Sequence, residues 1–294
     1  MLHKSLQLLL TVAVVVCGAL AQSQANRSGT CSFQPVQIGQ DYTSVYGITS
    51  SGIIVGTYNP NPSPQSGFTL NHGTVTSIAY PGAAFTSAYG MSDNGTVVGT
   101  YAVDLFSAQQ GYSWTNGTFT SLTYPASLAT YPTGVNKSGV VVGTYQDSQG
   151  ISHGFVYASG SYSAVDYPGA QSTLLSQVNN NGVMVGSFLD SANGEHGFID
   201  EHDTLREINY PGASNTVLTD INDKNQVSGT YYNNSYTTYH GFLWINGQFQ
   251  SVSDPGNAGH TALSGINNSG VLVGNLDSSG SGFKAIGCVA SKQD

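Results

Sequence analysis

The sequence predicts an all-β fold, a six-bladed β-propeller of four-stranded blades, on three observations: a long repeat, a charge-poor composition and an incomplete last copy. A segment resembling residues 134–145 occurs six times, and the glycine shared by the copies recurs every 43 to 45 residues. A period of about 40 to 45 residues is what one four-stranded propeller blade requires. The six copies begin near Gly47, Gly90, Gly134, Gln177, Asp220 and Gly265.

The composition fits a β protein with a neutral, polar surface. Charged residues make up 8% of the 294 positions, against roughly 25% in ordinary soluble domains. The formal net charge is −9, with only 7 Lys and Arg. Such a chain repels nucleic acid and anionic membranes, so we expect neither as a partner. No cofactor motif is present, and we expect no cofactor.

The N-terminus has the features of a secretory signal peptide over residues 1–21. Lys4 gives a basic start, residues 8–16 are mostly apolar, and residues 19–21 form a small-residue cleavage site. The apolar run is too short for a membrane span, and no second candidate follows it. We therefore expect a secreted, extracellular protein with a short linker at 22–30. Attachment of a lipid at Cys17 is the alternative.

Each repeat has the pattern of four strands, as the third copy illustrates. The first strand ends in a tight turn at Asn136, and the second is the apolar run 140–145. A polar loop of variable length leads to a third strand, which opens with Gly154-Phe155. The fourth strand follows a hairpin turn and ends at Tyr167-Pro168, where proline cannot donate to a ladder.

The two ends of the array complement each other. The sixth copy stops after its third strand, at residues 282–288, whereas residues 33–38 resemble a fourth strand without a preceding third. We expect residues 31–40 to complete the sixth blade and close the ring, which removes two exposed sheet edges. The propeller then spans 31–288, with a tail at 289–294, and we expect a monomer.

The cysteines support this closure. By repeat alignment, Cys31 and Cys288 lie near the two sides of the same broken hairpin turn. Two cysteines in an exported chain, once Cys17 is removed, meet the condition for a structural disulfide. We predict a Cys31–Cys288 bridge.

The repeat resembles the bacterial extracellular HAF repeat family, named for a His-Ala-Phe triplet that follows a Gly-[Ile/Leu]-Asn-x-x-Gly-x-x-Val-Gly segment. Residues 265–274 match the longer segment, and residues 153–155 match the triplet. The similarity covers roughly residues 42–288. Glycine replaces alanine in the triplet, and histidine occurs only at His153, His196 and His240. The resemblance implies export and a propeller-like fold, and it implies no established reaction.

Two groups of residues could bind a metal ion by their chemistry, but each also has a purely structural interpretation. His153, His196 and His240 recur in consecutive blades, which rotate them apart, so we expect each to hydrogen-bond neighbouring backbone instead. Asp200, His202 and Asp203 are chemically able to bind a divalent cation, but their position at a hairpin tip also fits a solvated turn. We expect no metal and regard this cluster as a weak candidate.

The loops between second and third strands differ most between copies, and binding residues concentrate on such loops. Aromatic side chains there are candidates for ligand binding: Tyr58, Phe106, Tyr232, Tyr236 and Tyr239. The Tyr80, Tyr124, Tyr167 and Tyr210 series recurs, which favours packing between blades. We predict non-enzymatic binding of a glycan or extracellular protein. The alternatives are a polysaccharide-acting lyase or hydrolase on the same face, and a structural cell-surface module.

Overall fold

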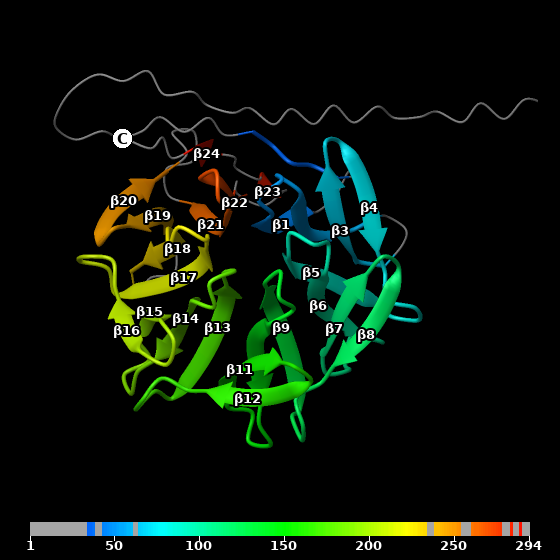
Figure 1. Cartoon of the computed structure of the whole chain (residues 1–294), viewed down its shortest axis with the longest axis horizontal. Helices are drawn as coiled ribbons and strands as arrows, with labels where there is room; N and C mark the ends of the chain where they lie inside the picture. Colours follow the sequence, from blue (N-terminus) through cyan, green and yellow to red (C-terminus); the bar gives the residue numbers. More distant parts are fainter. Residues whose placement is uncertain are drawn as a thin grey trace, which may run out of the picture.

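The computed structural model describes residues 34–38, 43–60, 64–233, 238–253, 260–277, 283–284 and 288–289. The expected signal peptide, the linker, Cys31 and Tyr236 lie outside these residues. The described chain forms six antiparallel sheets arranged around a central axis, as Figure 1 shows. The all-β propeller of four-stranded blades predicted from the repeat is confirmed.

Five sheets are complete four-stranded meanders, and we number them as blades in chain order. Blade 1 contains β1 (Thr43–Ile48), β2 (Ile54–Tyr58), β3 (Ser66–Asn71) and β4 (Thr74–Ile78). Blade 2 contains β5 (Phe85–Met91), β6 (Val97–Ala102), β7 (Gln110–Thr115) and β8 (Thr118–Leu122). Blade 3 contains β9 (Ala129–Val135), β10 (Val141–Gln146), β11 (Ser152–Ala158) and β12 (Ser161–Val165). Blade 4 contains β13 (Ser172–Val178), β14 (Met184–Leu189), β15 (Glu195–Asp200) and β16 (Leu205–Ile208). Blade 5 contains β17 (Asn215–Ile221), β18 (Val227–Tyr232), β19 (Tyr239–Ile245) and β20 (Gln248–Val252).

The sixth sheet is partial. It contains β21 (Thr261–Ile266), β22 (Val271–Asp277) and two short strands, β23 (Phe283–Lys284) and β24 (Cys288–Val289), both paired with β22. The third strand expected at 282–288 is thus present in two pieces. Residues 34–38 are described but are not a strand, so the expected six-bladed ring with a completed last blade is not reproduced in full.

Aromatic and aliphatic side chains fill the space between neighbouring blades. Between blades 1 and 2, for example, Val55 and Ile78 pack against Ala88, Val97 and Tyr112. Beside this cluster the ring of Tyr80 stacks on that of Tyr101 with 3.6 Å between centroids. The same stack recurs at three further junctions: Tyr124 with Tyr145, Tyr167 with Phe188, and Tyr210 with Tyr231. The packing role expected for this tyrosine series is confirmed.

The glycine that defines the repeat period lies where the first two strands of a blade approach most closely. A Cβ atom at Gly143 would lie 2.1 Å from the backbone oxygen of Tyr131, and at Gly99 it would lie 1.9 Å from that of Ser87. Each first strand carries a register shift at this level, which turns its backbone toward the glycine. A side chain cannot fit there, so this glycine recurs in every copy.

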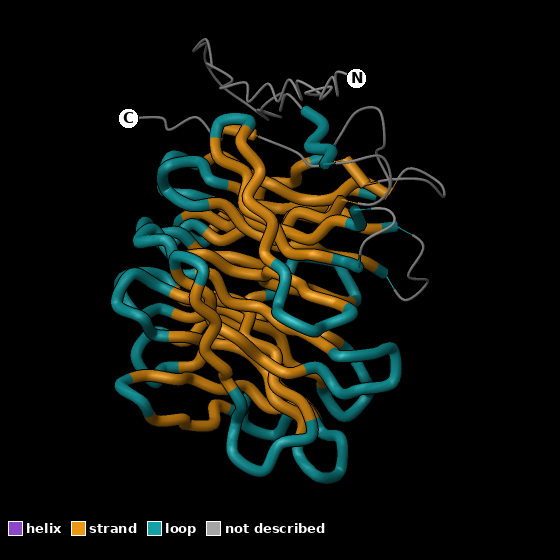
Figure 2. Tube along the Cα trace, turned by 90° about the vertical axis from the view of Figure 1, so that its right-hand side faces the viewer, coloured by secondary structure: helices purple, strands orange, loops and turns teal. Residues whose placement is uncertain are grey.

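The strands run between two layers of loops, as the side view in Figure 2 shows. One layer, which we call the turn face, holds the turns between the first and second strands of the blades. The other, the loop face, holds the loops between second and third strands and the connections between blades. Antiparallel meanders place these two sets of connections at opposite ends of the sheets. The two faces differ in structure and charge.

Candidate functional site

On the turn face, asparagine side chains link blades 3, 4 and 5, the sixth sheet and blade 1 by hydrogen bonds. In blades 3 to 6 the first turn residue is asparagine, and its Oδ1 accepts two backbone N–H groups of its own turn; at Asn136 these belong to Ser138 and Val140. Its Nδ2 donates to the backbone oxygen of the equivalent residue in the next blade. These bonds measure 3.0 to 3.2 Å and join Asn136 to Asn179, Asn179 to Asn222, Asn222 to Asn267 and Asn267 to Thr49.

A second set of hydrogen bonds links the following turn residue of each blade. The N–H of Asn180 donates to Asp223 Oδ1 at 2.8 Å, and the N–H of Asp223 donates to Asn268 Oδ1 at 2.8 Å. Asn268 Nδ2 in turn donates to Ser50 Oγ at 2.8 Å, across the junction between the sixth sheet and blade 1. The junction of blades 1 and 2 has the bond from Ser50 N–H to Asp93 Oδ1 at 2.8 Å.

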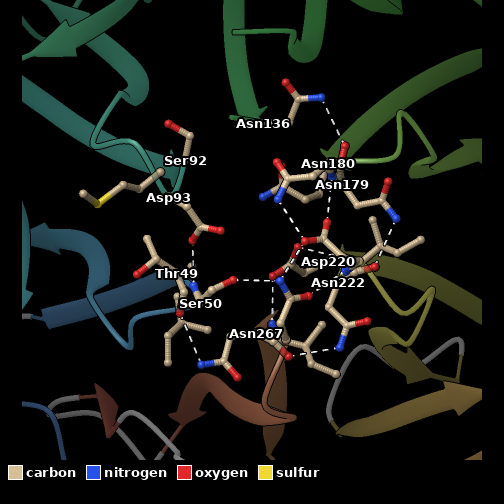
Figure 3. Close-up of a pocket in the computed structure, with 18 of the residues that line it drawn as sticks. Thr49, Ser50, Ser92, Asp93, Asn136, Asn179, Asn180, Asp220, Asn222 and Asn267 are labelled. Carbon is tan, nitrogen blue, oxygen red and sulfur yellow. Dashed lines mark hydrogen bonds between the residues drawn. The ribbon is translucent and has the colours of Figure 1, made fainter. Parts of the chain in front are cut away.

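A small cavity lies among these turns, where the first strands end (Figure 3). Its volume is about 60 Å³, room for roughly four water molecules. Most of the lining is turn backbone and asparagine side chains, to which Gln177 and Asp220 are added. The turn face therefore has a small polar recess with space for solvent.

Gln177 and Asp220 depart from the repeat in a position that is glycine in the other four copies. Asp220 is 6% exposed, and its carboxylate accepts the N–H of Ile221 at Oδ1 and that of Ile266 at Oδ2, both at 2.8 Å. Gln177 Oε1 accepts the N–H of Val178 at 3.0 Å. Burial raises the pKa of Asp220 to about 7, against the opposing effect of these N–H donors and of Gln177. Sequence reasoning did not single out Asp220, although the loss of glycine there was visible.

The loop face carries only negative charge in its described loops and connections. The charged residues there are Asp104, Asp147, Asp166 and Asp190. Lysine occurs instead in the turns of the opposite face, as Lys137 and Lys224, and Arg206 lies on β16. The described loops of one face are thus purely acidic, whereas the turns of the other face contain both acids and lysines.

Two of the recurring histidines bond to carboxylates, so the expected backbone hydrogen bonding is wrong for them. His196 Nε2 lies 3.1 Å from Asp190 Oδ2, and its Nδ1 lies 3.0 Å from Glu207 Oε1. His153 has the same arrangement, between Asp166 at 3.0 Å and Asp147 at 3.5 Å. An acid in the loop and another at the end of the fourth strand flank each ring, and these side chains reach the ring nitrogens directly. Each ring also stacks on an aromatic residue of the second strand.

The aromatic candidates for ligand binding do not form one site. Tyr58 ends β2, where its ring contacts that of Phe68 edge-on at 6.0 Å. Tyr232 is 8% exposed, and its hydroxyl donates to Glu195 of blade 4. Tyr239 lies beside Tyr232 with 5.5 Å between ring centroids. The structure brings this last pair together, and it places Phe106 apart from them on the loop between β6 and β7.

The weak metal candidate forms a tight turn at the tip of the β15–β16 hairpin. Asp200 is 2% exposed, and it occupies the position that Trp114 and Trp244 hold in blades 2 and 5. Burial raises the pKa of its carboxyl, which accepts the backbone N–H of Asp203. His202 and Asp203 have φ angles of 56° and 67°. Within the described part of the chain, no three His, Cys, Asp or Glu residues are placed to hold a metal ion.

Comparison with solved structures identifies similar folds at low sequence identity. The six-bladed β-propeller lectin of Aleuria aurantia, described with a novel fucose recognition mode, has a TM-score of 0.52 at 8% identity, covering 89% of this chain and 99% of the lectin. A point mutant of that lectin in complex with α-methyl-L-fucoside has a TM-score of 0.53 at 9% identity, covering 89% and 95%. A putative TolB of Agrobacterium tumefaciens has a TM-score of 0.56 at 13% identity, covering 71% and 79%.

No family model matches the sequence, and no curated protein matches it either. Among the described residues there is no helix long and apolar enough to cross a membrane. The structural neighbours share a β-propeller fold with this chain at 13% identity or less. The comparisons therefore show that the chain has the β-propeller fold.

Proposed function

We propose that the chain is a secreted, non-enzymatic binding protein that holds a glycan or protein ligand on its loop face. The observation that carries this proposal is the contrast between the two faces. The turn face is bridged by hydrogen bonds around a cavity of about 60 Å³. The loop face bears the exposed large apolar side chains of the described residues: Val103, Leu105, Phe106, Leu128 and Ile151. Residues that bind ligands gather on loops held by a rigid scaffold.

The similarity to a fucose-recognising propeller supports a glycan as one class of ligand. Half-buried Tyr239 lies next to Tyr232, whose hydroxyl donates to Glu195, so an aromatic ring adjoins polar groups here on the loop face. Aromatic rings pack on the apolar faces of ligands, and polar neighbours fix their orientation. We propose this junction of blades 4 and 5 as the glycan contact.

The polysaccharide-acting enzyme has less support. A catalytic histidine needs a ring nitrogen that reaches the substrate. In His153 and His196 both ring nitrogens face carboxylates within 3.5 Å. A purely structural module would not need an apolar loop tip as exposed as Phe106, whose side chain is 97% accessible.

We further propose that residues 31–40 complete the sixth blade. Val36 and Ile38 are buried in one cluster with Phe68 of blade 1 and Val273 of β22. Ile38 N–H donates to Thr43 Oγ1 at 3.0 Å, as Tyr80 N–H donates to Thr86 Oγ1 at the next junction. The Cys31–Cys288 bridge, membership of the HAF repeat family and export belong to this proposal. Peptide mapping of the secreted protein without reductant tests the bridge, and a free thiol at Cys31 contradicts it.

A glycan array probed with oxidised residues 22–294 tests the binding function. We expect saturable binding to a subset of glycans without turnover of soluble oligosaccharides. Tyr239→Ala should abolish that binding, whereas Ser138→Ala, an exposed change on the turn face, should leave it intact. Turnover of a bound oligosaccharide would favour the enzyme. Equal loss in both variants would place the ligand away from the loop face.

A further inference from the structure

One loop of blade 2 exposes an apolar tip that the fold does not require. In the loop between β6 and β7, the exposed fractions are 58% for Val103, 76% for Leu105 and 97% for Phe106. Leu128 and Ile151, at 51% and 39%, lie in the connection to blade 3 and in the loop of blade 3 on the same face. A group of exposed large apolar side chains, rimmed by polar residues, marks an interaction site in a soluble protein.

Hydrogen bonds to Asp104 tie the backbone of the apolar tip together. Asp104 Oδ1 accepts the N–H of Phe106 at 2.8 Å, the N–H of Ser107 at 2.7 Å and the hydroxyl of Ser107 at 2.8 Å. These donors lower the pKa of the Asp104 carboxyl. At the far end of the loop, Gln109 Oε1 accepts the hydroxyl of Thr100 at 2.8 Å. An ordered loop loses little conformational entropy on binding.

The negative charge around the tip favours some classes of binding partner over others. Asp104 lies within the tip, Asp147 and Asp166 follow in the loop and connection of blade 3, and the described loops and connections of this face contain no Lys or Arg. A second copy would oppose acid to acid, and an anionic membrane would be repelled. A partner with basic residues around its binding site complements this surface.

The chemistry of the tip also argues against a sugar at this place. A glycan needs convergent hydrogen-bonding groups for its hydroxyls. Here Asp104 Oδ1 already accepts three hydrogen bonds and Gln109 Oε1 accepts one from Thr100, while the large exposed side chains of the loop are two aliphatic groups and a phenyl ring. An exposed phenyl ring at a loop tip instead resembles the aromatic anchor residues of protein interfaces, which fill a pocket on the partner.

We propose that Leu105 and Phe106 insert into an apolar pocket with a basic rim on a partner protein. The inference rests on the proposed binding function of the loop face, and it specifies the class of partner that the loop between β6 and β7 would bind. Ala108, an exposed residue of the same loop, offers a position for a photoreactive side chain that disturbs no hydrogen bond of Asp104.

The test replaces Ala108 by p-benzoylphenylalanine and exposes the whole secreted chain to the proteins secreted by its source organism. A cross-linked protein is then purified and titrated against the unmodified chain. We expect Phe106→Ala to weaken its binding by about tenfold or more, and Leu105→Ala to weaken it as well. Raising the salt from about 50 to about 500 mM should weaken binding further, because the complementary charges are screened. Ser138→Ala is the matched control on the turn face.

Several results would overturn the inference. The first is that the Ala108-substituted chain cross-links no more strongly than the same chain carrying Phe106→Ala. The second is that the captured protein binds Phe106→Ala as tightly as the unmodified chain. The third is that raising the salt concentration does not change its affinity. A dimer, or binding to phosphatidylcholine vesicles, that disappears in Phe106→Ala would assign the tip to another occupant. Glycan binding lost in Tyr239→Ala, with no Phe106-dependent partner, would refute this inference and leave the proposed function standing. If neither the glycan array nor the cross-linking experiment finds a ligand, both the proposed function and this inference are refuted.

Discussion

Asp220 makes the stability of this propeller depend on pH near neutrality. Its carboxyl is buried at the end of β17, and burial raises the pKa from 3.8 to about 7 in the folded chain. Below pH 3.8 the folded and unfolded chains both hold the proton, and between 3.8 and about 7 only the folded chain holds it. The proton therefore stabilises the fold at low pH, and this contribution is lost as pH rises through the folded pKa.

The magnitude follows from the two pKa values. One pKa unit corresponds to about 1.4 kcal/mol, and linkage between pH 5 and pH 8 gives a loss of about 2.5 kcal/mol in the free energy of unfolding. For a domain of this size, that loss lowers the melting temperature by roughly 5 to 10 °C. Carboxyls with a lowered pKa, such as Asp147 and Asp190, are ionised throughout this window and add no slope.

Asp220→Asn provides the matched variant, because its amide has nearly the shape of the protonated acid and does not titrate. We expect the stability of the variant relative to the unmodified chain to rise by about 2.5 kcal/mol from pH 5 to pH 8. Urea unfolding followed by tryptophan fluorescence at four pH values measures it, and histidine contributions cancel in the difference. Parallel pH profiles for the two proteins would refute the reasoning. They would mean that the N–H groups of Ile221 and Ile266 offset the cost of burying the charge.

Three further changes test the contacts that hold the blades together. Asn179→Ser keeps an oxygen for its own turn but removes the Nδ2 bond to Asn222, so chemical unfolding should show a loss of about 1 to 3 kcal/mol. Tyr145→Phe should cost under about 1 kcal/mol of unfolding free energy, because Phe188 holds the equivalent position in blade 4. Tyr145→Ala should cost about 3 to 5 kcal/mol, because it removes the stack on Tyr124. Equal losses in the two variants would contradict the stacking role. Gly143→Ala should prevent folding or cost more than about 3 kcal/mol, and a normal melting temperature would show that the strands can separate to accept a Cβ.

The order and type of the strands follow from local sequence. These signals act over a few residues, so the strands of each copy can be predicted from that copy alone. Examples are turn residues such as Asn136 and Gly139, apolar second strands, and asparagine-glycine hairpins. The close approach at Gly143 also repeats with the sequence, but its cause, the register shift of β9, depends on how the strands pair. The tyrosine stacks were expected because their positions recur.

The fate of individual side chains depended on neighbours distant in sequence. Tyr232 was expected on an exposed loop, yet it ends β18 and is covered because Glu195 of blade 4 accepts its hydroxyl. His196 bonds to acids that arrive from a loop and from another strand. Phe106 is 97% exposed on the loop where it was expected, and Asp104 accepts hydrogen bonds from the backbone of Phe106 and Ser107.

The sequence by itself determined the repeat, the strand order within a blade and the propeller class, because periodic patterns and turn chemistry are local. Tertiary structure alone decided that asparagines 43 to 45 residues apart bond across neighbouring blades, and that Asp220 is buried beside a small cavity. These features depend on how successive blades rotate around a common axis, and that rotation is set by packing between residues from different copies.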